Sequence, residues 1–299
     1  MASAASPGDR VPESETRPEG PAFTVVGPAP ARRPRPWPEL LLIVWLCWVY
    51  DAIANLAPIR RAAATAHARG VLRVEEWLHL DPERSLDGWL VHHHTLAVLI
   101  SNYYDNAHFV VTLGLVGWLW WRHPGLYRPL RTALVLTNVI AFVVFLFDPT
   151  APPRLLDPSR YPDVVAATHA FGSWHSGTLA TAADQLAAMP SLHIAWAVWS
   201  SLALWRVLDR RRWALAVWLY PVLTAAAVMA TGNHFLLDVL AGAATLALAA
   251  LASDRWYGWR ARRRPGGAGH LPRAAARPVP RASSAVHRSP ATAPTAGPR

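Results

Sequence analysis

Two histidines stand where apolar stretches begin, in surroundings that suit nucleophilic and acid–base chemistry. His234 lies in "TGNHFLLDVLAG" (231–242), and Asp238 follows it at position i+4. Residues at i and i+4 share a helix face, so the Asp238 carboxylate can reach the His234 ring and hold it in one tautomer. His193 closes the sequence "MPSLH", in which Pro190 suits the first turn of a helix. A neutral imidazole can attack an electrophile and an imidazolium can donate a proton, so the pair predicts group transfer.

The elements that carry these residues are expected to lie in a membrane. Of the 299 residues, 53% are hydrophobic and 16 are Trp. Six apolar segments approach the roughly 20 residues that a spanning helix needs, namely 39–57, 104–121, 130–147, 190–208, 213–231 and 234–253. The sequence therefore predicts an all-α integral-membrane bundle of about six transmembrane helices, with an amphipathic extracytoplasmic helical segment within residues 58–103. The stretch "TLAVLIS" (95–101) either lengthens the second helix or forms a separate interfacial one.

Arginine distribution predicts the orientation of this bundle. With six spans, the clusters around Arg33, Arg128, Arg206 and Arg255 all fall on one side, which the positive-inside rule makes cytoplasmic. We thus expect a multi-pass protein of the plasma membrane with both termini cytoplasmic. Residues 1–36 are expected to form a disordered tail, 37–253 the membrane domain, and 254–299 a disordered basic tail. The basic tail either contacts anionic lipids or is simply solvated, and we expect no nucleic-acid partner.

Under this topology three motifs meet at the extracytoplasmic face. "FDPTAPPRLL" (147–156) leaves the third span, "MPSLHIAW" (189–196) enters the fourth, and "GNHFLLD" (232–238) enters the sixth. Arg154 offers a planar fork to phosphate oxygens, and a helix N-terminus also attracts phosphate. We therefore expect Arg154, Ser191 and Asn233 to bind a phosphate group. His234 paired with Asp238 can also be a structural contact between helices, but the three motifs together favour catalysis.

The expected reaction is phosphoryl transfer through a covalent phosphohistidine. His234 would attack phosphorus with Asp238 as its orienting partner, and His193 would protonate the leaving oxygen. Tyr104 and His108, one helical turn apart, either orient the substrate headgroup or merely occupy the interface. The motifs hold no carboxylate cluster of the kind that Mg²⁺ uses, so we expect no metal and no cofactor.

At these motifs the chain resembles the type 2 phosphatidic acid phosphatase superfamily. Pro190-Ser191-Leu192-His193 and the pair His234 and Asp238 match the second and third motifs of that family. "PSLH" with "GNHFLLDVLAG" is similar to the branch that contains the inositolphosphotransferases, and the likeness covers residues 40–252. The chain has no lysine and has Ala227-Val228 where the wider superfamily has a Ser-Arg pair, which leaves Arg154 as the clearest phosphate ligand.

The resemblance implies a metal-independent lipid phosphatase or lipid phosphotransferase, whose partners are a lipid phosphate and membrane lipids. A second hypothesis is a non-enzymatic membrane protein that binds or transports lipid headgroups. Binding alone needs positive charge more than a nucleophile with an orienting partner, so the two histidines and Asp238 favour the enzyme. A vanadate-dependent haloperoxidase has a similar pocket but is typically soluble.

Overall fold

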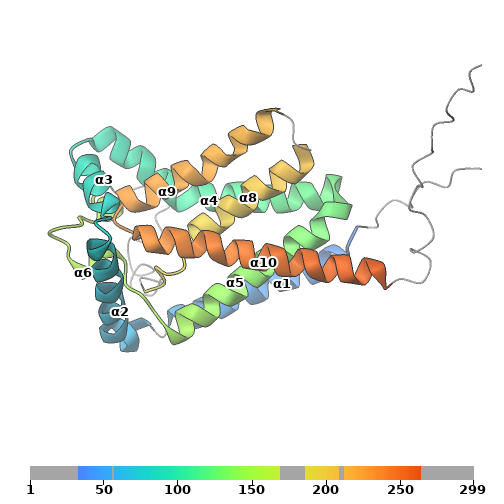
Figure 1. The fold of residues 1–299 in the computed structure, drawn as a ribbon, viewed down its shortest axis with the longest axis horizontal. Helices are drawn as coiled ribbons and strands as arrows, with labels where there is room; N and C mark the ends of the chain where they lie inside the picture. The colour runs from blue at the N-terminus through green and yellow to red at the C-terminus, as the bar shows by residue number, and fades with distance from the viewer. Residues whose placement is uncertain (1–32, 56, 169–185, 209–211, 264–299) are drawn as a thin grey trace, which may run out of the picture.

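The computed structural model describes residues 33–55, 57–168, 186–208 and 212–263, and in this part of the chain the regular elements are helices. The all-α prediction is therefore confirmed (Figure 1). In chain order the helices are α1 (Pro36–Ala54), α2 (Ala57–Trp77), α3 (Pro82–Val91), α4 (His94–Arg122), α5 (Pro124–Phe147), α6 (Pro153–Leu156), α7 (Val164–Thr168), α8 (Leu192–Leu208), the 3-10 helix η1 (Arg212–Trp218), α9 (Leu219–Ala230) and α10 (Leu236–Arg262).

The long helices lie side by side as a bundle. α10 packs against α5 and α8, α8 also packs against α4 and α9, and α1 packs against α5. Trp199 of α8 is fully buried at the centre of one core cluster, with Leu130 and Leu246 as neighbours. Its indole N–H donates to the Leu130 carbonyl at 2.8 Å, so this large side chain is buried with its polar group satisfied.

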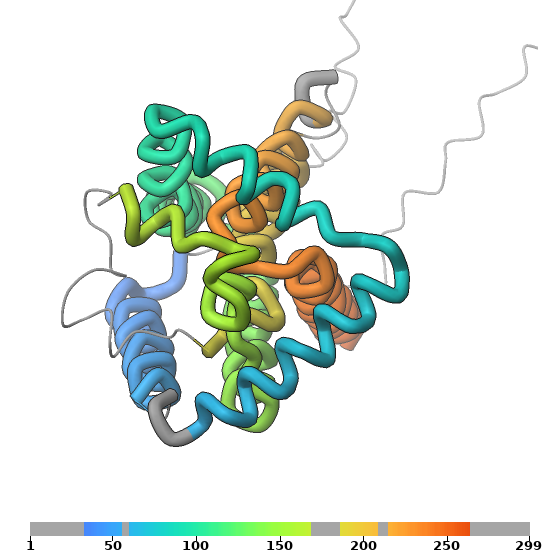
Figure 2. Tube along the Cα trace, turned by 90° about the vertical axis from the view of Figure 1, so that its left-hand side faces the viewer, coloured from blue at the N-terminus to red at the C-terminus, as the bar shows by residue number. Residues whose placement is uncertain are grey.

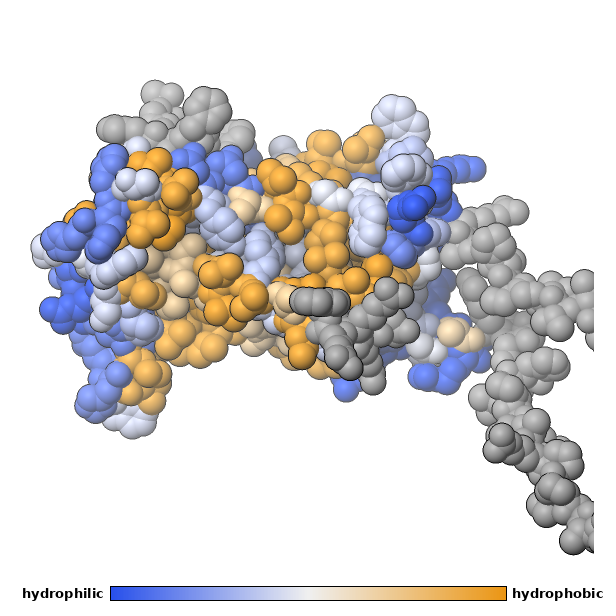
Figure 3. Space-filling model, turned by 90° about the horizontal axis from the view of Figure 1, so that it is seen from above, coloured by the Kyte–Doolittle hydropathy of each residue, from blue (hydrophilic) through white to orange (hydrophobic). Residues whose placement is uncertain are grey.

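Three of the described helices, α1, α5 and α10, are long and apolar enough to cross a membrane. Two shorter apolar helices, 192–208 and 215–230, lie beside them. Hydrophobic residues gather along the middle of the bundle and hydrophilic residues at its two ends (Figure 3). This pattern is that of an integral-membrane bundle, while the count of six spans stays a prediction.

Several helix ends differ from the predicted ones. α4 runs unbroken from His94 to Arg122, so "TLAVLIS" lengthens the second helix. The predicted span 213–231 is the 3-10 helix η1 followed by α9. α8 begins at Leu192 rather than at Pro190, which follows Met189 through a cis peptide bond.

α10 continues past the predicted end at 253 as far as Arg262, so the start of the expected basic tail is helical. Ser253 donates to the carbonyl of Pro129 at 2.8 Å, and Arg206 of α8 donates to both carboxylate oxygens of Asp254 at 3.0 and 2.6 Å. These contacts tie the last turns of α10 to α5 and α8. The remaining parts of the two predicted tails, 1–32 and 264–299, lie outside the described residues.

α2 and α3 lie across one end of the bundle, which Figure 2 shows end-on. α2 buries Ala64, Ala68 and Glu75, a spacing that places them on one helix face. This agrees with the amphipathic helical segment that the sequence predicts. Arg160, in the loop after α6, pairs with Glu76 in the last turn of α2 and with Asp81, the N-cap residue of α3. At this same end of the bundle α5 ends and α8 and α10 begin.

Candidate active site

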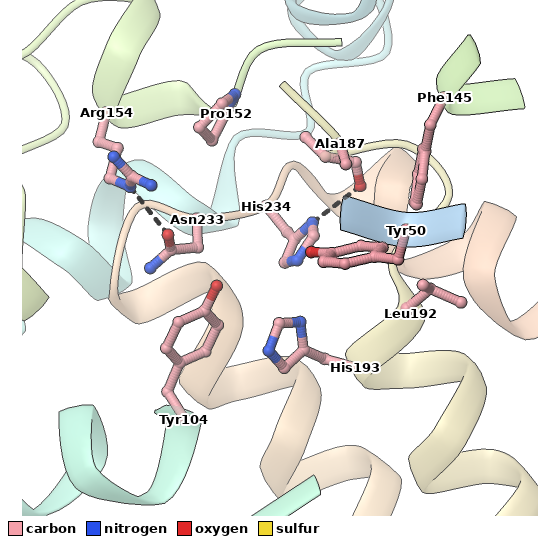
Figure 4. Close-up of a pocket in the computed structure, with 11 residues that line it drawn as sticks. Tyr50, Tyr104, Phe145, Pro152, Arg154, Ala187, Leu192, His193, Asn233 and His234 are labelled. Atoms are coloured by element: carbon pink, nitrogen blue, oxygen red, sulfur yellow. Dashed lines mark hydrogen bonds between the residues drawn. The ribbon is translucent and has the colours of Figure 1, made fainter. Parts of the chain in front are cut away.

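The three sequence motifs meet in one pocket at the end of the bundle covered by α2 and α3. The pocket opens to solvent, and together with its open mouth it contains about 470 Å³ of empty space. Its polar lining consists of Tyr104, Arg154, His193, Asn233 and His234, and its more apolar lining of Tyr50, Phe145, Pro152, Ala187, Ala188 and Leu192. Figure 4 shows these side chains converging from α1, α4, α5, α6, α8 and the loops before α6, α8 and α10. The predicted convergence of the motifs is therefore present.

His234 is held by the backbone carbonyl of Ala188. The Nδ1 atom of His234 lies 2.9 Å from that oxygen, and the side chain is only 4% exposed. A carbonyl oxygen can only accept a hydrogen bond, so Nδ1 carries the hydrogen and, in the neutral ring, Nε2 carries the lone pair. Nε2 is directed into the pocket (Figure 4). The ring is thus fixed in the tautomer that a nucleophile requires.

Asp238 lies beside this histidine without making its principal hydrogen bond. Its Oδ2 is 3.6 Å from Nδ1 of His234 and 2.9 Å from the amide nitrogen of Phe235, which donates to it. The carboxylate therefore caps the first turn of α10 and adds negative charge near the His234 ring. We expected Asp238 to orient the ring, but the Ala188 carbonyl makes the direct contact.

A short backbone pairing places that carbonyl. Thr150 donates its N–H to Leu186 at 2.9 Å, and Ala188 donates its N–H to Thr150 at 3.0 Å. The first motif therefore forms a bridge with the segment that precedes α8. This pairing turns the Ala188 carbonyl toward His234, so the first motif supports His234 through the backbone of the residue that precedes the second motif.

His193 is held by aromatic rings. It stacks on Tyr104 with ring centroids 4.5 Å apart and meets His108 edge-on at 4.3 Å. The His193 and His234 ring centroids are 5.6 Å apart, so one phosphate group can lie between the two imidazoles. Nδ1 of His108 lies 3.0 Å from the Tyr104 carbonyl. We expected Tyr104 and His108 either to orient the headgroup or to occupy the interface. Tyr104 lines the pocket and His108 lies behind His193.

Arg154 presents its guanidinium from the opposite wall. The side chain is buried, Nε donates to Asn233 Oδ1 at 2.8 Å, and Nη1 donates to Asp163 at 3.3 Å. Its own amide donates to the carbonyl of Gly232 at 3.0 Å. Gly232 has a φ of +64°, a conformation that a side chain disfavours. Asn233 thus orients the arginine and lines the pocket, and the phosphate contact that we expected of it stays a prediction.

Ser191 is fully buried where α8 meets α10. Its amide donates to the Asp238 carbonyl at 3.1 Å, and its hydroxyl accepts from the amide of Ile194 at 3.5 Å. A Cβ on Gly242 would overlap the Ser191 carbonyl, so only glycine lets the two helices approach this closely. Ser191 joins the second and third motifs, and the phosphate contact that we expected of it stays a prediction.

Sequence reasoning missed three contributors to the site. Ala188 acts through its backbone, which gives no side-chain signal. Tyr50 sits inside the apolar run of α1, yet its ring lines the pocket and is turned toward His234 (Figure 4). Asp163 pairs with Arg154 from a loop whose sequence contains no recognisable motif.

The described residues contain no group of three or more His, Cys, Asp or Glu side chains placed to hold a metal ion. Arg154 is the only Arg or Lys among the residues that line this described pocket. The site as resolved therefore offers two imidazoles, one guanidinium and a carboxylate behind the buried imidazole. Such a set suits an anionic, tetrahedral substrate group.

Comparisons with known proteins agree with this geometry. A family model described as the PAP2 superfamily matches residues 69–252, a range that contains all three motifs. Comparison with curated proteins and with solved structures gave no match. With most of its length matched by that model and its motifs gathered in one pocket, the chain belongs to the PAP2 superfamily.

Proposed function

We propose that this protein is a membrane lipid phosphatase or lipid phosphotransferase that works through a phosphohistidine on His234. The observation that carries the proposal is the contact between Nδ1 of His234 and the Ala188 carbonyl. This oxygen accepts a hydrogen bond from Nδ1, so Nε2 is the atom that can attack. Membership of the PAP2 superfamily supports a phosphatase-type activity. A binding protein would have no use for a nucleophile fixed in this way.

In the first step Nε2 of His234 forms a bond to phosphorus, and the bond from phosphorus to the alcohol oxygen breaks. Protonated His193 donates its proton to that oxygen, which would otherwise leave as an alkoxide. Arg154 binds the phosphate oxygens and the nearby Asp238 carboxylate stabilises the ring as it becomes charged. The alcohol leaves and the phosphate stays on His234.

In the second step His193, now neutral, removes a proton from the acceptor. The acceptor oxygen attacks phosphorus, the bond to Nε2 of His234 breaks, and His193 is again protonated. Water as acceptor releases free phosphate, and an alcohol yields a new phosphoester. The similarity of "PSLH" and "GNHFLLDVLAG" to the inositolphosphotransferase-like branch supports an alcohol.

The site is proposed to face the extracytoplasmic side of the plasma membrane. Arg122 and Arg128 lie where α4 joins α5, and Arg206 and Arg255 lie on the late turns of α8 and α10, at the end of the bundle away from the pocket. By the positive-inside rule that end is cytoplasmic. The apolar part of the pocket lining, with Tyr50 and Phe145, suits the lipid portion of a phosphate ester.

Purified protein in proteoliposomes would test this proposal. Phosphatidic acid, polyprenyl phosphates and phosphoinositides are supplied with EDTA, and free phosphate and new lipid products are both measured against His234→Ala. Brief incubation with radiolabelled substrate should leave acid-labile label on the wild type only. If both proteins bind lipid and neither becomes labelled, the result would instead support the hypothesis of a non-enzymatic lipid-binding protein.

A further inference from the structure

Glu75 of α2 is buried against the first turn of α10. The side chain is 0% exposed, and its Oε1 accepts a hydrogen bond from the Leu237 amide at 2.7 Å. Asp238 Oδ2 takes the Phe235 amide of the same turn at 2.9 Å. Two of the amides that open α10 are thus bound by carboxylates, one from within the helix and one from a residue 162 positions away.

Burying this carboxylate costs free energy, because the group loses its hydration. A hydrogen bond from an amide at a helix N-terminus compensates part of that loss. Glu83 of α3 is also fully buried. Burial, together with the neighbouring Glu75 carboxyl group, raises the pKa of Glu83 to about 9. At neutral pH Glu83 therefore keeps its proton. Burial raises the pKa of Glu75 as well, and the hydrogen bond from the Leu237 amide opposes that rise.

The segment that Glu75 fixes carries the chemistry. Leu237 lies between His234 and Asp238, and the Asp238 carbonyl in turn accepts the Ser191 amide at 3.1 Å. A shift of the first turn of α10 would move His234 relative to the Ala188 carbonyl and also disturb the start of α8. Misplacement of a reacting group by about 1 Å can cost about 10²-fold in rate.

We propose that Glu75 is a positioning residue of the active site, which anchors the Leu237 amide and thereby holds His234 and Asp238 in their reactive arrangement. The inference rests on the proposed phosphoryl transfer and gives α2 and α3 a function in it. Glu75 touches no reacting atom in this scheme and acts only through α10.

The test compares Glu75→Leu, Glu75→Gln and the matched control Glu76→Gln in proteoliposomes. Glu76 is the adjacent residue and pairs with Arg160 at the surface instead. We expect Glu75→Leu to lower kcat by about 10²-fold, with little change in KM, per folded molecule. Glu75→Gln keeps an oxygen acceptor for the Leu237 amide and should restore kcat to within about tenfold of wild type. Glu76→Gln should behave as wild type.

Hydrogen–deuterium exchange gives a readout that needs no substrate. Peptides that cover residues 233–240 should exchange faster in Glu75→Leu and at the wild-type rate in Glu76→Gln, because the Leu237 amide loses its acceptor. Unchanged exchange there would overturn the inference even if the wild type showed no activity. An inactive wild type with the expected exchange pattern would instead contradict the proposed function.

A folding defect is separated from loss of positioning by a double variant. The variant that combines Glu75→Leu with Glu83→Leu removes both acids of this pair. Neither carboxyl group is then left buried without the other. We expect this variant to fold and still to show the lowered kcat. Wild-type kcat in the folded double variant, or activity losses that only follow the folded fraction, would overturn the inference.

Discussion

The helix starts that bear the two histidines hold them by different means. His234, at the start of α10, is buried and bound to a backbone carbonyl, with Asp238 and Glu75 occupying the amides of the first turn. His193, at the start of α8, is partly exposed and lies among the rings of Tyr104 and His108. A hydrogen bond to a carbonyl selects one tautomer of the neutral imidazole, whereas stacked rings impose no choice between the two nitrogens. The difference suits a nucleophile on one side and a group that gives and takes a proton on the other.

Replacing the residue fixed by the carbonyl should have the largest effect. In His234→Ala we expect phosphoryl transfer to fall by about 10⁴-fold or more, because no covalent intermediate can form. Steady-state turnover and acid-labile labelling of the purified variant measure this. Labelled protein from His234→Ala would show that another residue is the nucleophile.

Replacing His193, which lies among aromatic rings, should reduce the rate less, and the size of the loss should depend on the leaving group. In His193→Ala we expect a loss of about 10²- to 10⁴-fold with alkyl phosphate esters. With a nitrophenyl ester, whose leaving group needs no proton, the loss in the first step should be much smaller. Equal losses for both esters in a rapid-quench experiment would contradict the role of His193 as the acid.

The close contact between Gly242 of α10 and Ser191, which precedes α8, can be broken without changing either histidine. In Gly242→Ala the new methyl group overlaps the Ser191 carbonyl, so α8 and α10 must separate. We expect roughly 1–3 kcal/mol of destabilisation and a fall in kcat of about 10²-fold. Gly117→Ala is the matched control, since nothing lies within 4 Å of a Cβ there. Thermal unfolding and turnover of both variants check the prediction, and equal behaviour would contradict it.

Weakening the stack around His193 should have a modest effect. Tyr104→Leu removes the ring that lies 4.5 Å from His193, whereas Tyr104→Phe keeps it. Aromatic pairs contribute about 0.5–1.5 kcal/mol, so we expect kcat to fall by roughly threefold to tenfold in the leucine variant only. An equal loss in Tyr104→Phe would indicate that the hydroxyl matters more than the ring.

The smallest effect on catalysis is expected from Asp87, whose carboxyl group lies beside Gly232, two residues before His234. Burial and the nearby Asp163 raise the pKa of Asp87 from 3.8 to about 7. The folded state then binds more protons than the unfolded state between these values, so stability falls as pH rises through this window and stays reduced above it. In Asp87→Asn that dependence should vanish.

The measurement is the melting temperature of wild type and Asp87→Asn in detergent from pH 4 to pH 8. The difference between the two proteins should shift in favour of the variant by a few degrees as pH rises. A constant difference across this range would mean that Asp87 does not titrate with folding.

The apolar runs and arginine clusters suffice to place the main helices, because burial in a bilayer requires length and hydrophobicity alone. The same topology brings Arg154, His193 and His234 to one end of the bundle. The role of the Ala188 carbonyl could not be predicted from the sequence, because its position depends on a backbone pairing between distant segments. Glu75 did leave a signal, because its spacing from Ala64 and Ala68 places it on their face of a helix.

The first helix lies outside the matched range 69–252, yet it supplies Tyr50 to the pocket and packs against α5. The residues that would make and break bonds and the residue that closes the apolar wall are therefore encoded in separate stretches of the gene. A substitution at Tyr50 of α1 can therefore reshape the pocket wall while leaving both histidines and their supports unchanged.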